Sequence, residues 1–463
     1  MTTRRVLLTL LAALATAPVV RAQSPATPDL FLHSVPTGQP SGTTLPLSLA
    51  DAVKRGLEQN LGVVLEQARV DASGGKRVRD LADLLPHVSA GVRESGQVVN
   101  LAAFGFTGFP GIPQVIGPFG VFDARLFLST PLYDAVALGT MRESRELERA
   151  EAFTYRNVRE LVILAVGNAY LEAVADSARV DSAKSEVATA EALAKLADDQ
   201  RAAGVVAGID VLRQQVQLES ARARLITTQN TFEKQKLKLA RAIGLPPGQG
   251  FELTDRPKYA AAAPIDLETA VAQAYASRDD LKSAEERVRA AEAARQAARG
   301  NAWPSVHVDA DFGALGSSVS TTERTYVVAA GVRVPVFDGG TTRGKVEQAD
   351  ADLRARQAEF EDLRATIRAD VTEALLDLQA ADATVHVTEN ARTLARQQLT
   401  QAEDRFRAGV TDTIELTEAQ QANVIATERY ISSVYAHTLA KAALARAVGQ
   451  IEEQFLKLVG GQQ

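Results

Sequence analysis

The sequence predicts a mainly α-helical protein with a small β part, in which one structural unit occurs twice. Three observations support this fold class. Two long stretches without proline, 132–245 and 336–463, are rich in Ala, Leu, Glu, Arg, Gln and Lys, which are strong helix formers. Segments between the prolines alternate apolar and polar residues, as β-strands do. Positions in the first half of the chain recur in the same order in the second half, which indicates a duplication.

The composition excludes several kinds of site. The chain has 463 residues and no cysteine, so it has no disulfide, thiolate metal site, thiol nucleophile or lipid attached through cysteine. A net charge of −6 gives no support to nucleic-acid binding. The chain contains no glycine-rich phosphate loop, Gly-x-Ser-x-Gly elbow or His-Glu-x-x-His motif. We therefore expect no enzyme activity and no cofactor.

The N-terminus has the features of an export signal. Arg4 and Arg5 precede an apolar run from Val6 to Val20, and Ala22 follows as a small residue suited to cleavage. We therefore expect a signal peptide over 1–22, followed by an extended segment over 23–46. Beyond it we expect no transmembrane helix, so the exported chain is either a soluble protein or a β-barrel membrane protein.

Two repeats follow the signal peptide, the first over 47–250 and the second over 264–455. Leu49 aligns with Leu267 at the start of the repeats, and Gly204 aligns with Gly409 at the break within each proline-free stretch. A proline-rich linker over 251–263 joins the repeats, and 456–463 forms a C-terminal tail. The first repeat has a longer Gly- and Phe-rich segment at 101–120 than the second repeat has at the matching position. Because loops absorb insertions easily, we expect a loop at this point in both repeats.

Each repeat is expected to contain two strands and a long helical hairpin. The strands are predicted at about 86–98 and 121–131 in the first repeat, and at about 304–314 and 324–335 in the second. The helical hairpins are predicted over 134–244 and 338–449. Each hairpin has a first helix of ~60 residues, hence ~90 Å long, and a returning helix of ~40 residues. Helices of this length belong in a coiled-coil-like bundle.

Four strands create a problem if they cross a membrane, because open sheet edges are not tolerated in lipid. Even small outer-membrane barrels have ~8 strands, so several chains would have to share one barrel. A dimer would supply eight strands and a trimer twelve. A soluble sandwich would show the same alternation, so the pattern leaves both alternatives open.

Several motifs occur in order in both repeats. Leu-x-x-Ala-Val occurs at 49–53 and 267–271, and prolines at 86 and 304 precede the strands. Pro-Leu-Tyr-Asp at 131–134 corresponds to Pro-Val-Phe-Asp at 335–338, and Ala-Gly-Val occurs at 203–205 and 408–410. Together these motifs, over about 47–455, resemble the TolC-like outer-membrane efflux protein family.

The resemblance implies a homotrimer with a twelve-stranded transmembrane β-barrel in outer-membrane lipid, four strands coming from each chain. The helical hairpins would continue this barrel as a periplasmic α-barrel, so that most of the chain lies in the periplasm. It implies a passive exit duct for efflux or type I secretion, joined by a periplasmic adaptor protein to an inner-membrane transporter. The alternative from the residues alone is a soluble exported coiled-coil protein with a structural or binding role.

A gate is expected at the periplasmic end of the helices. Glu415 and Glu418 are spaced i, i+3 and so share one face of a helix. The resemblance implies that acids at these positions ring and narrow the tunnel, and that Asp210 helps to latch the closed tip. The family's basic latch partner is replaced here by Thr411, and Arg407 is a candidate substitute.

The turns Gly204-Val205 and Gly409-Val410 are expected to reverse the chain, because glycine readily adopts the left-handed conformation that ends a helix. The resemblance implies that these tips contact the adaptor.

Three aromatic residues at strand ends, Trp303, Tyr133 and Phe337, are candidates for a membrane-interface belt. His307, Asp309 and Asp311 alternate along one strand, but spacing along a single strand rarely surrounds a metal ion. We therefore interpret them as a polar lumen or solvent face, and expect no metal site.

Overall fold

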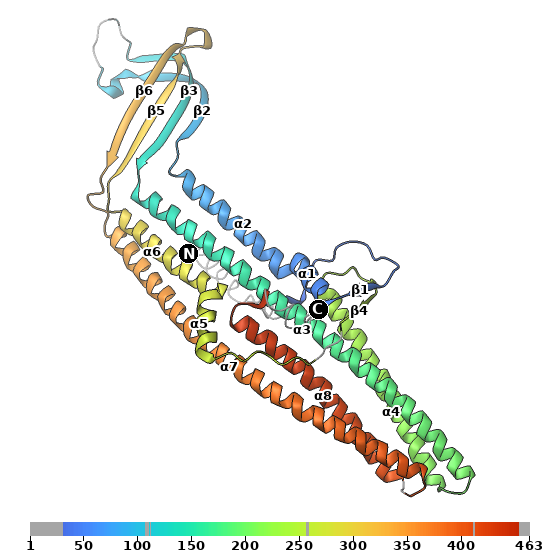
Figure 1. The fold of residues 1–463 in the computed structure, drawn as a ribbon. Helices are drawn as coiled ribbons and strands as arrows, with labels where there is room; N and C mark the ends of the chain where they lie inside the picture. The colour runs from blue at the N-terminus through green and yellow to red at the C-terminus, as the bar shows by residue number, and fades with distance from the viewer. Residues whose placement is uncertain (1–30, 107–110, 112, 256–258, 411–412, 453–463) are drawn as a thin grey trace, which may run out of the picture.

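The computed structural model describes residues 31–106, 111, 113–255, 259–410 and 413–452. The predicted signal peptide and the tail at 456–463 lie outside these residues. The chain is elongated, with a four-stranded sheet at one end and long helices running to the other (Figure 1). The predicted fold class, mainly α with a small β part and an internal duplication, is confirmed.

The sheet has the strand order β2-β3-β5-β6, and all neighbouring strands are antiparallel. The strands are β2 (His87–Asn100), β3 (Val115–Tyr133), β5 (Ser305–Gly316) and β6 (Glu323–Arg333). Two short 3-10 turns, Leu101–Phe104 and Val319–Thr321, lie in the strand connections. The structure differs from the expected loop over 101–120, because β3 begins at Val115. Apolar residues there continue the pairing with β2.

The register gives the sheet one apolar and one polar face. Leu126 pairs with Phe312, which pairs with Tyr326, so three large apolar side chains share one face. The adjacent row places Phe127 beside Asp311, on the face that also carries Asp309. An apolar outer face and a polar inner face are typical of strands in a membrane barrel.

Two hairpins of long helices extend from the sheet. The first consists of α3 (Ala135–Ala202) and α4 (Gly208–Ala242), and the second of α7 (Thr341–Arg407) and α8 (Thr413–Ala447). The first helices have 68 and 67 residues and the returning helices have 35, so the expected lengths were too short and slightly too long, respectively. Each first helix is therefore ~100 Å long.

Shorter elements surround the middle of the long helices. They are α1 (Leu49–Gln59), α2 (Leu61–Ala82), α5 (Leu267–Ser277) and α6 (Asp279–Gly300). The region expected to be an extended segment and a linker contains a small parallel sheet, in which β1 (Leu45–Leu47) pairs with β4 (Phe251–Leu253). This sheet ties the beginning of the first repeat to its end.

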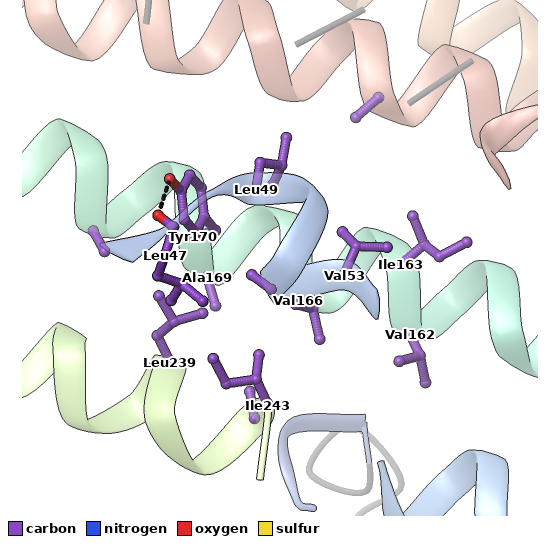
Figure 2. Packing of buried hydrophobic residues seen from close by; sticks show 14 of the residues in the cluster. Leu47, Leu49, Val53, Val162, Ile163, Val166, Ala169, Tyr170, Leu239 and Ile243 are labelled. Carbon is purple, nitrogen blue, oxygen red and sulfur yellow. Dashed lines mark hydrogen bonds between the residues drawn. The ribbon is translucent and has the colours of Figure 1, made fainter. Parts of the chain in front are cut away.

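The largest core cluster lies where α1 and α4 pack on α3 (Figure 2). Val166 and Tyr170 of α3 are fully buried, and the Tyr170 hydroxyl donates to the Leu47 carbonyl at 3.0 Å. The second repeat has a matching core around Ala270 and Val271, which align with the buried residues Ala52 and Val53. Equivalent buried positions are what a duplicated fold requires.

One stretch of α3 is long and apolar enough to cross a membrane by composition alone. This does not contradict the expectation of no transmembrane helix, because a buried core helix meets the same criteria. In this protein 61% of the stretch is buried, where it supplies the core just described.

Candidate gate at the helical tip

The two long hairpins reverse direction at the same end of the molecule, farthest from the sheet (Figure 1). Gly204 has φ +75° and Gly409 has φ +66°, a left-handed conformation that strains other residues. In both turns the residue after the glycine, Val205 or Val410, donates its N–H to a carbonyl of the preceding helix, at 2.9 and 3.0 Å. Both glycines therefore end a helix in the same way.

The two turns lie against each other and remain accessible from outside. A Cβ atom built on Gly409 would lie 3.5 Å from Cγ1 of Val205. The side chains of Val205 and Val410 are 58% and 70% exposed. The Gln200 amide donates to the carbonyl of Phe406 at 3.1 Å and so joins the end of α3 to the end of α7.

A small apolar core holds the four helix ends together. Phe406 of α7 is 1% exposed, and Leu416 of α8 is fully buried. The other buried members come from all four helices: Leu193, Ala197, Val211, Ala402 and Ala419. The tip is therefore a packed unit within one chain.

Asp210 connects the beginnings of the two returning helices. The hydroxyl of Thr413, which is fully buried, donates to Oδ1 of Asp210 at 2.6 Å. Arg213 lies one turn along α4, with its guanidinium 3.2 Å from the same oxygen. The bond between Asp210 and Thr413 therefore joins α4 to α8.

The two predicted gate glutamates lie in the first turns of α8. Glu415 forms an ion pair with Arg405 of α7 at 3.1 Å, with their side chains 40% and 56% exposed. Glu418 is exposed. The structure thus places Glu415 in the link between α7 and α8, whereas Asp210 belongs to the link between α4 and α8.

The proposed substitute for the latch partner has acidic neighbours on its own helix. Arg407 lies 3.1 Å from Asp404 and 3.7 Å from Glu403. Burial raises the pKa of Glu403, and the nearby positive charge of Arg407 opposes that shift. Thr411 lies outside the described residues.

The two hairpins separate above the tip. A cavity of about 1430 Å³ lies between them, with α3 and α8 supplying most of its wall. Its lining is rich in Ser, Thr, Gln and Asn side chains, including Ser182, Thr189, Gln421 and Asn423. The cavity therefore separates the two hairpins between the tip core and the core near the middle of α3, and its wall also carries apolar side chains such as Val174 and Ile431.

A buried pair of opposite charges lies near that central core. Glu160 of α3 is 6% exposed, and its carboxylate is 3.5 Å from the guanidinium of Arg446 on α8. Burial raises the pKa of Glu160 to about 7, although the charge of Arg446 acts in the opposite direction. Arg446 also donates to the Asn157 amide oxygen at 2.5 Å.

The acids on the polar face of the sheet have partners. Asp311 accepts from Arg125 at 2.7 Å, and Asp309 accepts from the Ser129 hydroxyl at 2.7 Å. His307 lies 3.6 Å from Asp309. Within the part of the chain that the structure describes, no group of three His, Cys, Asp or Glu side chains is arranged to hold a metal ion.

The three candidate interface aromatics lie where the sheet meets the helices. Tyr133 ends β3, Trp303 precedes β5 and Phe337 follows β6. All three side chains are exposed. A membrane-interface belt at this level stays a prediction.

Sequence comparison identifies relatives along most of the chain. Residues 53–245 and 270–450 match the family described as outer membrane efflux protein. The pyoverdine export outer membrane protein OpmQ of Pseudomonas aeruginosa is 23% identical over 66% of this chain, which spans just under two thirds of that relative, 65%. The probable efflux pump outer membrane protein TtgC of Pseudomonas putida is 22% identical over 87% of this chain and 83% of its own length.

Solved structures show the same fold. The outer-membrane channel OprN has a TM-score of 0.74 and 20% identity, covering 90% of this chain and 98% of that one. The outer membrane protein VceC from Vibrio cholerae has a TM-score of 0.74 and 17% identity, covering 87% of this chain and 96% of that one.

Proposed function

The chain belongs to the outer membrane efflux protein family, and on this premise we propose that three copies form the passive channel of a tripartite efflux or type I secretion system. It is an outer membrane protein with a large periplasmic helical part. The soluble coiled-coil alternative is not favoured by this membership.

The observation that carries the trimer is a sheet with two open edges. Within the described residues, β2 and β6 each pair with only one neighbour in the four-stranded sheet. Unpaired backbone groups at such edges are costly in lipid, whereas pairing β6 of one copy with β2 of the next closes the sheet. Three copies then supply twelve strands, and the apolar face carrying Leu126, Phe312 and Tyr326 faces the acyl chains.

The tip supplies the gate of the proposed channel. Opening requires α7 and α8 to move away from α3 and α4. Two of the links that such a movement breaks are the bond from Thr413 to Asp210 and the bond from Gln200 to Phe406. The cavity between the hairpins leaves little direct packing there to oppose the movement, which also has to separate the apolar residues of the tip core. In a trimer, Glu415 and Glu418 supply six carboxylates near this constriction, which favours cations.

Partners follow from the same arrangement. The exposed turns carrying Val205 and Val410 are the surface that a periplasmic adaptor contacts, and the adaptor joins the channel to an inner-membrane transporter. The transporter supplies the energy, since the channel itself is a passive conduit.

Single-channel recording in a planar bilayer tests the function, together with the mass of the purified protein in detergent. Three chains that give small cation-selective conductance steps would support the proposal. A monomeric protein that stays soluble without detergent and shows no conductance would refute the proposal.

A further inference from the structure

The outer end of the β2–β3 hairpin contains no charged residue. From Glu94 on β2 to Asp123 on β3, every residue between them is uncharged. The corresponding connection between β5 and β6 is short and polar, with Ser317 and Ser318 followed by Glu323 and Arg324. The two repeats therefore differ at the end of the sheet that lies away from the helices.

The β2–β3 hairpin also extends farther than its neighbour. Pairing between β3 and β5 ends at Phe122 and Gly316, whereas pairing between β2 and β3 continues to Asn100 and Val115. The additional part of β3 adds roughly 20 Å at ~3.4 Å per residue. We call residues 98–106 and 113–119 the outer segment.

The outer segment lies beyond the membrane thickness that the other strands span. With its 12 residues, β5 is long enough to cross the bilayer. At ~3.3 Å per residue and a tilt of ~45°, such a strand rises ~28 Å, close to the ~25 Å height of a barrel's apolar band. Acyl chains therefore do not cover the outer segment of the neighbouring hairpin.

The outer segment nevertheless exposes large apolar side chains. Phe104 is 71% exposed, Val98 is 61% exposed and Val115 is 53% exposed, and Ile116 and Phe119 are more than one third exposed. An apolar cluster outside the acyl layer is stabilised by protein contact, because both water and polar headgroups solvate it poorly.

The direction of the segment indicates which protein it meets. A Cβ atom built on Gly120 would lie 2.8 Å from the Ser317 carbonyl, so the hairpin passes close to the β5–β6 connection. Figure 1 shows the described part of the hairpin bending across the ends of β5 and β6, toward the open edge of β6. In the proposed trimer, that side of β6 belongs to the next copy.

We propose that the outer segment packs against the outer segment of the neighbouring copy and holds the three copies together at the outer end of the barrel. This inference rests on the proposed trimer. The partner surface is apolar and uncharged, and it is supplied by the same residues of a second chain.

Photo-crosslinking tests the contact directly. Phe104→p-benzoylphenylalanine, irradiated in native outer membranes, is expected to give covalent dimers and trimers of the chain. The comparison variant is Tyr326→p-benzoylphenylalanine, on the apolar face of β6, which is expected to form lipid adducts. Lipid or lipopolysaccharide adducts alone at position 104, or no adduct in a sample that is trimeric by mass, would overturn the contact. A monomeric sample would overturn the proposed trimer as well.

A second measurement uses milder substitutions. Phe104→Ser combined with Val98→Ser is expected to lower, by several degrees, the temperature at which half of the detergent-solubilised trimer dissociates. Val336→Ser is the matched control, because Val336 is 93% exposed and lies at the opposite end of the sheet. Equal dissociation temperatures for wild type and the double variant would contradict the inference.

Discussion

Thr413→Val tests whether the bond between α4 and α8 holds the tip closed. The side chain keeps its shape in this variant but loses the hydroxyl that donates to Asp210 at 2.6 Å. Thr413 is fully buried and the Asp210 side chain is 18% exposed, so water replaces the lost donor only in part. The variant therefore weakens the closed arrangement without creating a large cavity.

The size of the effect follows from the geometry. A hydrogen bond to a charged group contributes ~1.5–3 kcal/mol. Arg213 remains 3.2 Å from Asp210 in the variant, so we take the lower end of that range. A loss of ~1.5 kcal/mol shifts the equilibrium between closed and open tips by roughly tenfold per chain. If the three tips open together, the upper bound is ~1,000-fold.

Open probability in single-channel recordings measures this shift. Thr413→Ser keeps the hydroxyl and serves as the matched control, and a double-mutant cycle with Asp210→Asn isolates the pairwise contribution. The reasoning would be refuted if Thr413→Val and Thr413→Ser both matched wild type. It would also be refuted if the effects of Thr413→Val and Asp210→Asn were simply additive.

Three further predictions concern charge and stability. Glu415→Gln combined with Glu418→Gln should reduce cation preference, and an unchanged reversal potential in a salt gradient would place both residues outside the constriction. Tyr170→Phe should lower the free energy of unfolding by ~1–3 kcal/mol, because it removes the one hydroxyl hydrogen that the Asp255 carboxylate and the Leu47 carbonyl share; an unchanged denaturation midpoint would contradict this. The pKa of Glu160 is about 7 in the native state, above its value of 4.5 in the unfolded chain. Between these two pH values the native state binds more protons than the unfolded state, so stability falls as the pH rises from one to the other. Glu160→Gln should flatten that slope in thermal melts from pH 5 to 8, and parallel profiles for variant and wild type would exclude this cause.

Local signals in the sequence accounted for the long helices and their turns. The absence of proline over 132–245 and the strong helix formers there favour a long helix, and Gly204 at its break is suited to a left-handed cap. These properties depend on residues close together in the chain, which is why they could be predicted without a fold. The predicted start of β3, at about 121, was too late, because the Gly- and Phe-rich segment before it contains both turn and strand formers.

The partners of the gate residues could not be predicted in the same way. Thr413 was missed because its significance lies in Asp210, which is distant in sequence and comes near only when both hairpins pack at the tip. Arg405 is close to Glu415 in sequence, but it was missed because their contact depends on how α7 and α8 pack after the turn between them. The small sheet formed by β1 and β4 also joins segments at opposite ends of the first repeat.

By itself, the sequence determined the duplication, the helical hairpins, the alternating strands and the family, because each is encoded by local periodicity or by an ordered set of motifs. Only the tertiary structure decided which charged groups pair at the tip, that an apolar stretch of α3 is core rather than a membrane span, and that the outer hairpin extends past its neighbour. The physical reason is that burial and hydrogen-bond partners depend on distances between elements. Those distances are set when the two repeats pack, and no local pattern in the chain records them.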